Sequence, residues 1–256
     1  MRAVLLLVAV CALCGCAAAA AARGPLPNTC KGAQNTLPLV NYDASTATKI
    51  AMVPNGTLSS VMPAQGVVPL LVLHVYGDSY SMGYAYGQLL QEQLAVQIPQ
   101  AYAYFGEKYG LSPDVVNWVL DVTRNATKDF TPPHHFEFMQ GVADGTGGNT
   151  TFEAFWRLAM LPEAIKASCS IAGAWGQATA TGGLLQLRAL DWGTDGPFQE
   201  MPLLATFHPD DGSFAHSSLG WVGLYGTLTG YSESNLAVSE KVWDAYKVCL
   251  FFHSSS

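Results

Sequence analysis

Residues 167–192 consist of two short apolar runs joined by a Gly-Gly pair at 182–183. A Gly-Gly pair between two runs that favour β structure is a strong signal for a β-hairpin. Cys169 opens the first run, and Arg188 and Asp191 close the second. The predicted hairpin therefore brings Arg188 and Asp191 back beside Cys169.

These three residue types suit nucleophilic chemistry. The thiolate is the nucleophilic form of cysteine, and a free cysteine has a pKa of about 8.5, so a thiol needs help to react at neutral pH. A cation and a carboxylate held beside the sulfur are suitable helpers. The alternative interpretation is a buried structural cysteine next to a structural Arg–Asp pair, because buried cysteines are common.

Three segments, taken in their order along the chain, resemble one protein superfamily. They are 77–90 (GDSYSMGYAYGQLL), the Cys169-Ser-Ile string followed by a glycine-containing turn and Arg188-x-x-Asp191-Trp, and 230–243 (GYSESNLAVSEKVW). Together they resemble the cysteine N-terminal-nucleophile hydrolases, and most of all the acid-ceramidase-like and phospholipase-B-like amidohydrolases. Choloylglycine hydrolases and isopenicillin-N acyltransferases are more distant members of that superfamily.

The resemblance implies a fold and a reaction. The fold is an α+β chain with the four-layer αββα sandwich of these hydrolases, incomplete here, behind a mainly helical propeptide region. The reaction begins with self-cleavage between Ser168 and Cys169, after which the α-amine of Cys169 serves as general base for its own thiol. Cys169 then attacks the amide of an N-acylated lipid or small amide and forms a thioester, without a cofactor. Asp191 would orient the amine, Arg188 would position Asp191, and Ser232 matches an oxyanion-binding asparagine of several relatives.

Other functions fit the same residues. An acyltransferase of the superfamily would pass the acyl group to an amine instead of water. An inactive, truncated secreted protein is a different class, and a phosphate-binding protein has only weak glycine signals in its favour. Ceramides, N-acylethanolamine-type lipids and peptidic amides are all compatible with the predicted amidase.

The start of the chain has the pattern of a targeting segment. Residues 1–22 comprise a positive residue at Arg2, an apolar stretch at 4–13 and an alanine run, as in a signal peptide. The apolar stretch is shorter than the ~20 residues that span a bilayer, so we expect no transmembrane segment. A lipoprotein signal with a lipidation box at 13–16 is the minor alternative. The predicted location is secreted or a lysosome-like lumen.

Three N-x-[ST] sequons lie in polar, loop-like surroundings, at Asn55, Asn125 and Asn149. Behind a signal segment they predict a glycoprotein. Three cysteines remain once the signal is removed: Cys30, Cys169 and Cys249. A Cys30–Cys249 disulfide would leave Cys169 free, although sequence alone does not show that these two approach each other.

Composition excludes several classes of protein. Of the 256 residues, 50% are hydrophobic and only 12% are charged, so the chain can bury a sizeable core and is not disordered. A net charge of −7 argues against nucleic acid as a partner, which calls for a basic surface. The pair His134-His135 lacks the spacing of a zinc site and predicts a surface or capping role, so we expect no metal.

Periodicity and turn residues predict helices before Cys169 and strands after Asp191. Residues 23–66 are expected to be loop-rich. Gly83 and Gly87 lie on one face of the first helix, where another backbone can approach closely. The expected helices are 80–104, one starting at 113, 136–142 and 152–165, and the expected strands are 67–75, 203–207, 214–219, 223–229 and 236–242. Residues 23–168 are thus the propeptide region, 169–247 the start of a catalytic chain, and 248–256 an aberrant or truncated tail.

Overall fold

The computed structural model describes residues 42–66, 68–164, 168–193 and 195–241. The predicted signal segment, Cys30, Cys249 and the 248–256 tail lie outside these residues. The described helices are η1 (Ala44–Thr46), α2 (Ser79–Tyr109), α3 (Pro113–Thr127), η2 (Lys128–Phe130), α4 (Pro133–Gly145), α5 (Phe152–Ala164) and η3 (Pro197–Glu200). The described strands are β1 (Thr48–Val53), β2 (Gly56–Val61), β3 (Leu70–Gly77), β4 (Ser168–Gly176), β5 (Gly182–Asp191), β6 (Pro202–Pro209), β7 (His216–Trp221), β8 (Thr229–Ser232) and β9 (Ala237–Ser239).

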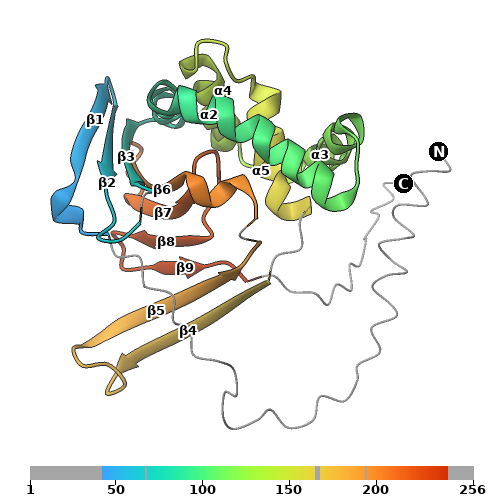
Figure 1. Ribbon diagram of the computed structural model, residues 1–256. Helices are drawn as coiled ribbons and strands as arrows, with labels where there is room; N and C mark the ends of the chain where they lie inside the picture. Colours follow the sequence, from blue (N-terminus) through green and yellow to red (C-terminus); the bar gives the residue numbers. More distant parts are fainter. Residues whose placement is uncertain (1–41, 67, 165–167, 194, 242–256) are drawn as a thin grey trace, which may run out of the picture. The chain divides into compact units, whose positions relative to one another are not determined.

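In this part of the chain seven strands form one sheet, in the order β1-β2-β3-β6-β7-β8-β9 (Figure 1). Strands β3 and β6 are parallel, and every other neighbouring pair is antiparallel. Helices α2 to α5 gather on one side of the sheet, and the hairpin β4–β5 lies on the other side (Figure 1). The combination of a large sheet with several helices confirms the α+β prediction. Among the described helices, none has the length and apolar character to cross a membrane.

The core lies between the sheet and helix α2. Along β3, Leu71, Leu73 and Val75 are buried and alternate with residues that are less buried, as expected when one face of a strand meets a helix layer. The side chains of Leu89 and Leu94 on α2 belong to the same apolar cluster. Burial of this face fixes the register of the sheet, because a one-residue slip would turn it to the other side.

Helices α2 and α4 pack backbone against backbone through glycines. A methyl group at Gly83 would overlap the carbonyl oxygen of Phe138, and one at Gly141 would overlap the carbonyl oxygen of Tyr80. Gly87 on α2 and Gly145 on α4 form equivalent contacts one turn further along. The prediction of close backbone approach at Gly83 and Gly87 is confirmed.

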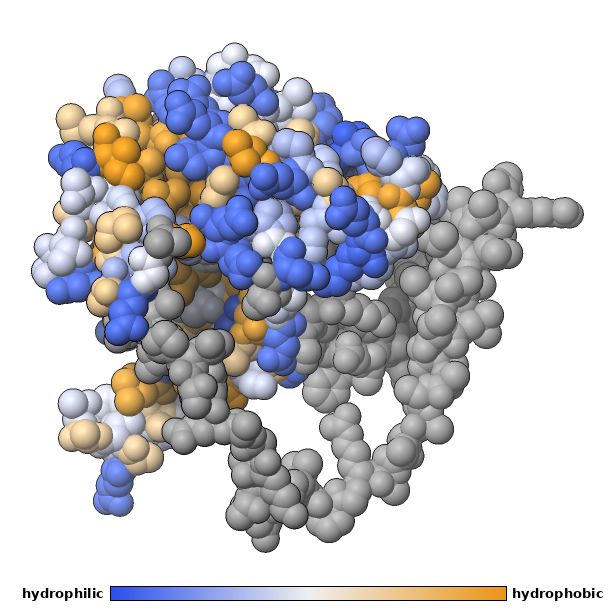
Figure 2. Space-filling model, in the orientation of Figure 1, coloured by the Kyte–Doolittle hydropathy of each residue, from blue (hydrophilic) through white to orange (hydrophobic). Residues whose placement is uncertain are grey.

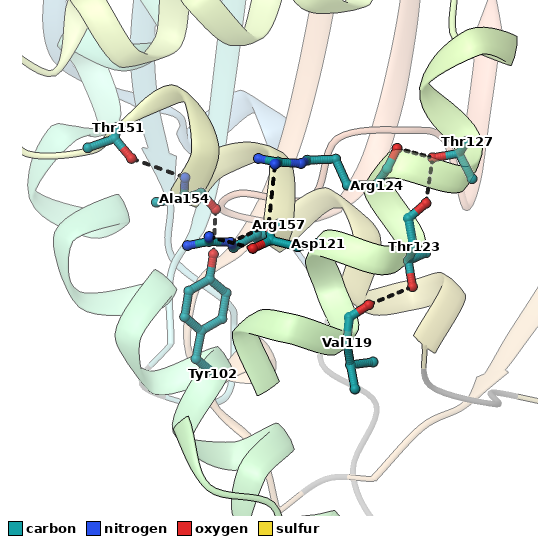
Figure 3. Close-up of polar contacts among 9 residues, drawn as sticks. All are labelled: Tyr102, Val119, Asp121, Thr123, Arg124, Thr127, Thr151, Ala154 and Arg157. Atoms are coloured by element: carbon teal, nitrogen blue, oxygen red, sulfur yellow. Dashed lines mark hydrogen bonds and ion pairs between the residues drawn. The ribbon is translucent and has the colours of Figure 1, made fainter. Parts of the chain in front are cut away.

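A polar network ties α3 to α5 beside this core (Figure 3). The guanidinium of Arg157 donates two hydrogen bonds to the carboxylate of Asp121, at 2.8 and 2.7 Å. These bonds hold the pKa of Asp121 below its usual value, despite the opposing effect of burial. Arg124 contacts the same carboxylate at 3.6 Å, and the Tyr102 hydroxyl donates to the carbonyl of Ala154.

Two sequence predictions about strands were wrong. Residues 23–66 were expected to be loop-rich, but β1 and β2 form a hairpin whose turn holds Asn55 at φ 63°. The Asn-Gly pair at 55–56, which is also part of a sequon, is the local hairpin signal for this turn. Residues 223–229 were expected to form a strand, but only Thr229 belongs to one, because the amide of Gly223 donates to the buried hydroxyl of Tyr86 instead of to a neighbouring strand.

Candidate functional site

The hairpin predicted around Cys169 is present as β4 and β5, which pair antiparallel, but its turn spans residues 177–181 and the Gly-Gly pair lies at the start of β5. Cys169 lies opposite Leu190, and Ile171 lies opposite Arg188. Residues two apart on a strand share a face, and residues directly opposite each other do so as well. Cys169 and Arg188 therefore project from the same face of the hairpin, as diagonal neighbours.

That geometry places a cation against the sulfur. Arg188 Nη2 donates to Cys169 Sγ at 3.2 Å, and Arg188 Nη1 lies 3.4 Å from Thr229 Oγ1 on strand β8 of the large sheet. Cys169 is 2% exposed, and the side chain of Arg188 is 6% exposed. In such a dry site the positive charge interacts strongly with any negative charge on the sulfur.

Glu240 completes the cluster. Its Oε2 accepts hydrogen bonds from Arg188 Nη2 at 3.2 Å and from the Cys169 thiol at 3.3 Å. The main-chain amide of Glu240 donates to the carbonyl of Leu228, which holds the residue just after β9. Sequence reasoning missed Glu240, although it lies within 230–243, one of the three segments that carry the family resemblance. We refer to Cys169, Arg188 and Glu240 as the thiol cluster.

Asp191 occupies a different position from the thiol cluster. It lies opposite Ser168 in the hairpin and is exposed. The alternation along β5 turns its side chain to the face opposite that of Arg188. Its backbone comes back beside Cys169 as predicted. Its carboxylate, however, projects from the face of the hairpin opposite the sulfur.

Ser232 does not reach the thiol cluster either. It pairs with His216 on β7, and its hydroxyl donates to the carbonyl of Ala215 at 3.3 Å. It is three residues from Thr229 on β8, so the two side chains project from opposite faces of the sheet. The structure therefore separates Ser232 from the sulfur.

A cavity of about 510 Å³, which we call the hairpin cavity, opens between the hairpin and the large sheet. Arg188 lines it, and the Gln186 side-chain amide donates to the Ser239 hydroxyl across it. Its apolar lining residues are Leu184, Leu204, Leu219, Ala237 and Val238. The Nε of Arg188 is buried and has no hydrogen-bond partner within the described residues, so a donor remains for a bound molecule.

Exposed apolar side chains lie on both faces of the hairpin. Trp175, Leu185 and Leu187 are each more than 60% exposed, and apolar atoms show in orange and tan on the free end of the hairpin in Figure 2. A two-stranded sheet is marginal on its own in water. Its contacts with Thr229, Ser239 and Glu240 therefore help to hold the nucleophile in place.

Two curated proteins are similar to this chain, both from Dictyostelium discoideum. Protein dcd1A is 35% identical over 242 residues, which cover 85% of this chain and 53% of the relative. Protein dcd1B is 39% identical over 201 residues, which cover 68% of this chain and 38% of the relative. The chain thus spans about half the length, or less, of these relatives. No family model matches the sequence.

The three sequon asparagines are exposed in the structure. Asn55 lies in the turn between β1 and β2, and Asn149 lies in the turn that follows α4. Asn125 was expected in a loop-like segment, but it lies in helix α3. Each position leaves room for a glycan, because exposed side chains do not pack against neighbours.

Substitutions in the thiol cluster are expected to change thiol alkylation in opposite directions. Arg188→Met removes the cation beside the sulfur but keeps the carboxylate of Glu240. Alkylation by iodoacetamide at pH 7 should therefore slow about tenfold or more, which corresponds to a loss of about 1.4 kcal/mol in stabilisation of the thiolate. Glu240→Gln removes the negative charge that disfavours the thiolate, so alkylation, which needs no proton acceptor, should accelerate. Lys241→Met and Glu233→Gln, which change exposed charges, are the matched controls. Equal rates in Arg188→Met and Lys241→Met would mean that Arg188 does not influence the thiol.

Proposed function

We propose that this chain carries the nucleophile of a self-processing amidohydrolase of the cysteine N-terminal-nucleophile type. One observation carries the proposal: a buried thiol at the start of a β-hairpin contacts both a guanidinium and a carboxylate. Charged partners of both signs around a buried cysteine suit a reactive thiol better than an inert one.

The first step is cleavage of the chain. The sulfur of Cys169 adds to the carbonyl carbon of Ser168, and its proton passes to the departing amide nitrogen of Cys169. The Ser168–Cys169 peptide bond breaks, and a thioester between Ser168 and the sulfur forms in its place. Water then cleaves the thioester, which leaves a carboxylate on Ser168 and a free thiol and α-amine on Cys169. Glu240, which accepts from the thiol at 3.3 Å, is placed to take its proton in the uncut chain.

The second step is turnover. The unperturbed pKa of an α-amine is about 7.7–8.0, so the new amine of Cys169 can take the thiol proton as the sulfur attacks a substrate amide. The proton goes to the leaving amine, and the acyl group stays on sulfur as a thioester. Water then releases the carboxylic acid and regenerates the thiol. Asp191, which pairs with Ser168 in the hairpin, would hold the new amine after cleavage.

The surroundings of the thiol cluster support an acylated substrate. The apolar walls of the hairpin cavity suit an acyl chain, and the free Nε of Arg188 is a donor for a carbonyl or carboxylate oxygen. An N-acylated lipid or small amide is therefore the proposed substrate class. The helix layer, the large sheet and the hairpin sheet would be three of the four layers of an αββα sandwich. A secreted or lysosome-like glycoprotein, with glycans on Asn55, Asn125 and Asn149, is the proposed setting.

N-terminal sequencing with intact mass analysis of the protein from its natural source tests the proposal. We expect a new chain that begins at Cys169, and an acylated Cys169 peptide after brief exposure to a fluorescent N-acyl amide. Products measured with and without an added amine separate hydrolysis from acyl transfer. A single uncut chain that fails to hydrolyse any of a series of N-acyl amides would instead support an inactive secreted protein.

A further inference from the structure

A second cavity, of about 170 Å³, lies on the opposite side of the large sheet from the thiol cluster. We call it the helix-side cavity. Leu203 and Ala205 line it, whereas Leu204, between them on β6, lines the hairpin cavity. Neighbouring residues of a strand point to opposite faces, so the sheet separates the two cavities. The proposed amidase reaction makes no use of this second cavity.

The floor of the helix-side cavity is apolar and buried. Phe138, Leu203, Ala205 and Trp221 line it and are at most 8% exposed. The ring of Phe138 stacks on that of Tyr225, with centroids 4.6 Å apart and planes at 6°. An apolar protein cavity of about 150 Å³ holds one benzene molecule. The floor therefore matches a single aromatic ring in size and in chemistry.

Three imidazoles line the cavity, and two of them are exposed, which places them at its mouth. His134 and His135 come from the first turn of α4, and His216 comes from β7. His134 and His216 are exposed, while His135 is half-buried and its Nδ1 lies 2.6 Å from the hydroxyl of Tyr225. The expected surface or capping role of His134-His135 thus describes His134, whereas His135 belongs to the cavity wall.

We propose that the helix-side cavity binds a small aromatic carboxylate, with its ring on the apolar floor and its carboxylate at the imidazoles. Charged imidazoles bind an oxygen anion through short, strong hydrogen bonds. The Tyr225 hydroxyl, already bonded to His135, offers a further polar partner.

The charge of the mouth depends on pH. The groups that face it are His134 and His135 from α4, His216 from β7 and Tyr225 from the segment between β7 and β8. Asp211 interacts with His134. Residues of α2 and β6 that line the cavity carry no titratable group within the described part of the chain. Burial, and then the charge of His134, lower the pKa of His135, whereas a bound carboxylate would favour its charged form.

The sign of the pH dependence follows from these charges. A carboxylate stabilises charged imidazoles, so its affinity should rise as the pH falls from 7.5 to 5.5. Affinity should fall again below about pH 4, where the free carboxylate becomes protonated. Burial raises the pKa of Tyr225, so its hydroxyl stays protonated across this range.

Isothermal titration of the full chain with phenylacetate tests the proposal. At pH 5.5 we expect saturable binding below about 1 mM, at least tenfold tighter than at pH 7.5 and tenfold tighter than binding of the neutral 2-phenylethanol. Ala205→Leu fills the floor and His216→Gln removes an exposed imidazole from the mouth, so each should weaken binding about tenfold. His208→Gln, on the other face of the sheet, is the matched control and should bind as the wild type does.

Several results would overturn the proposal. They are no binding at 5 mM phenylacetate, equal affinity for 2-phenylethanol, and unchanged binding in both Ala205→Leu and His216→Gln. Thermal unfolding of each variant checks the fold, and His216→Gln keeps the test sharp if Ala205→Leu is unstable, because His216 is exposed. The thiol of Cys169 plays no part in these measurements, so they are independent of the proposed amidase activity.

Discussion

Cys169→Ala is expected to abolish both cleavage of the chain at Ser168–Cys169 and hydrolysis of N-acyl amides. Both reactions pass through a thioester on the same sulfur, and alanine offers no atom that could carry the acyl group. The rate should fall by about 10³-fold or more, to the uncatalysed background. Gel mobility and intact mass report on cleavage, and release of a fluorescent amine reports on hydrolysis.

The control for this substitution is Ser170→Ala. Ser170 is the next residue on β4, is exposed, and projects from the opposite face of the hairpin, so its loss should leave both reactions unchanged. Cys169→Ser adds a graded test, because a hydroxyl is a weaker nucleophile than a thiol and should slow cleavage without changing its position. Cleavage and hydrolysis that persist in Cys169→Ala would refute the proposed function.

Gly141→Val is expected to cause the largest loss of stability. A Cβ at this position overlaps the carbonyl oxygen of Tyr80 and comes within 2.8 Å of the amide nitrogen of Tyr84. Both contacts are backbone atoms, so no side chain can rotate away to make room. Helices α2 and α4 must therefore separate along the whole contact that their glycines form. Overpacking usually costs about 1–3 kcal/mol, and we expect about 3 kcal/mol or more of the free energy of unfolding here. Urea unfolding followed by circular dichroism measures it.

Gly173→Ala is the matched glycine control. The nearest atoms to a Cβ at Gly173 lie 3.8 and 3.9 Å away, which is ordinary contact, so the change should cost less than about 1 kcal/mol. Gly83→Ala should resemble Gly141→Val in sign, since its Cβ overlaps the carbonyl oxygen of Phe138 from the partner helix. If Gly141→Val and Gly173→Ala unfold at the same urea concentration, the close packing of α2 on α4 is wrong.

The sequence by itself determined the features that depend on neighbouring residues. The Gly-Gly pair at 182–183 predicted the β4–β5 hairpin, although the turn itself lies at 177–181, and turn residues predicted the helix that starts at 113. Gly83 and Gly87 predicted a close helix contact, because four-residue spacing places both on one face. The Asn-Gly pair at 55–56 carries the same kind of local information about the hairpin of β1 and β2.

Only the tertiary structure decided what surrounds the sulfur. Arg188 was predicted beside Cys169 because both lie on one hairpin, whereas Glu240 is 71 positions away along the chain and arrives through the β8–β9 end of the large sheet. Successive side chains of a strand point to opposite faces, so residues that are close in sequence can lie on different sides of a sheet. For this reason Asp191 and Ser232 project away from the thiol cluster. The physical reason is that turn chemistry acts over a few residues, whereas a partly buried ion pair needs partners that only packing of the hairpin on the sheet can bring together.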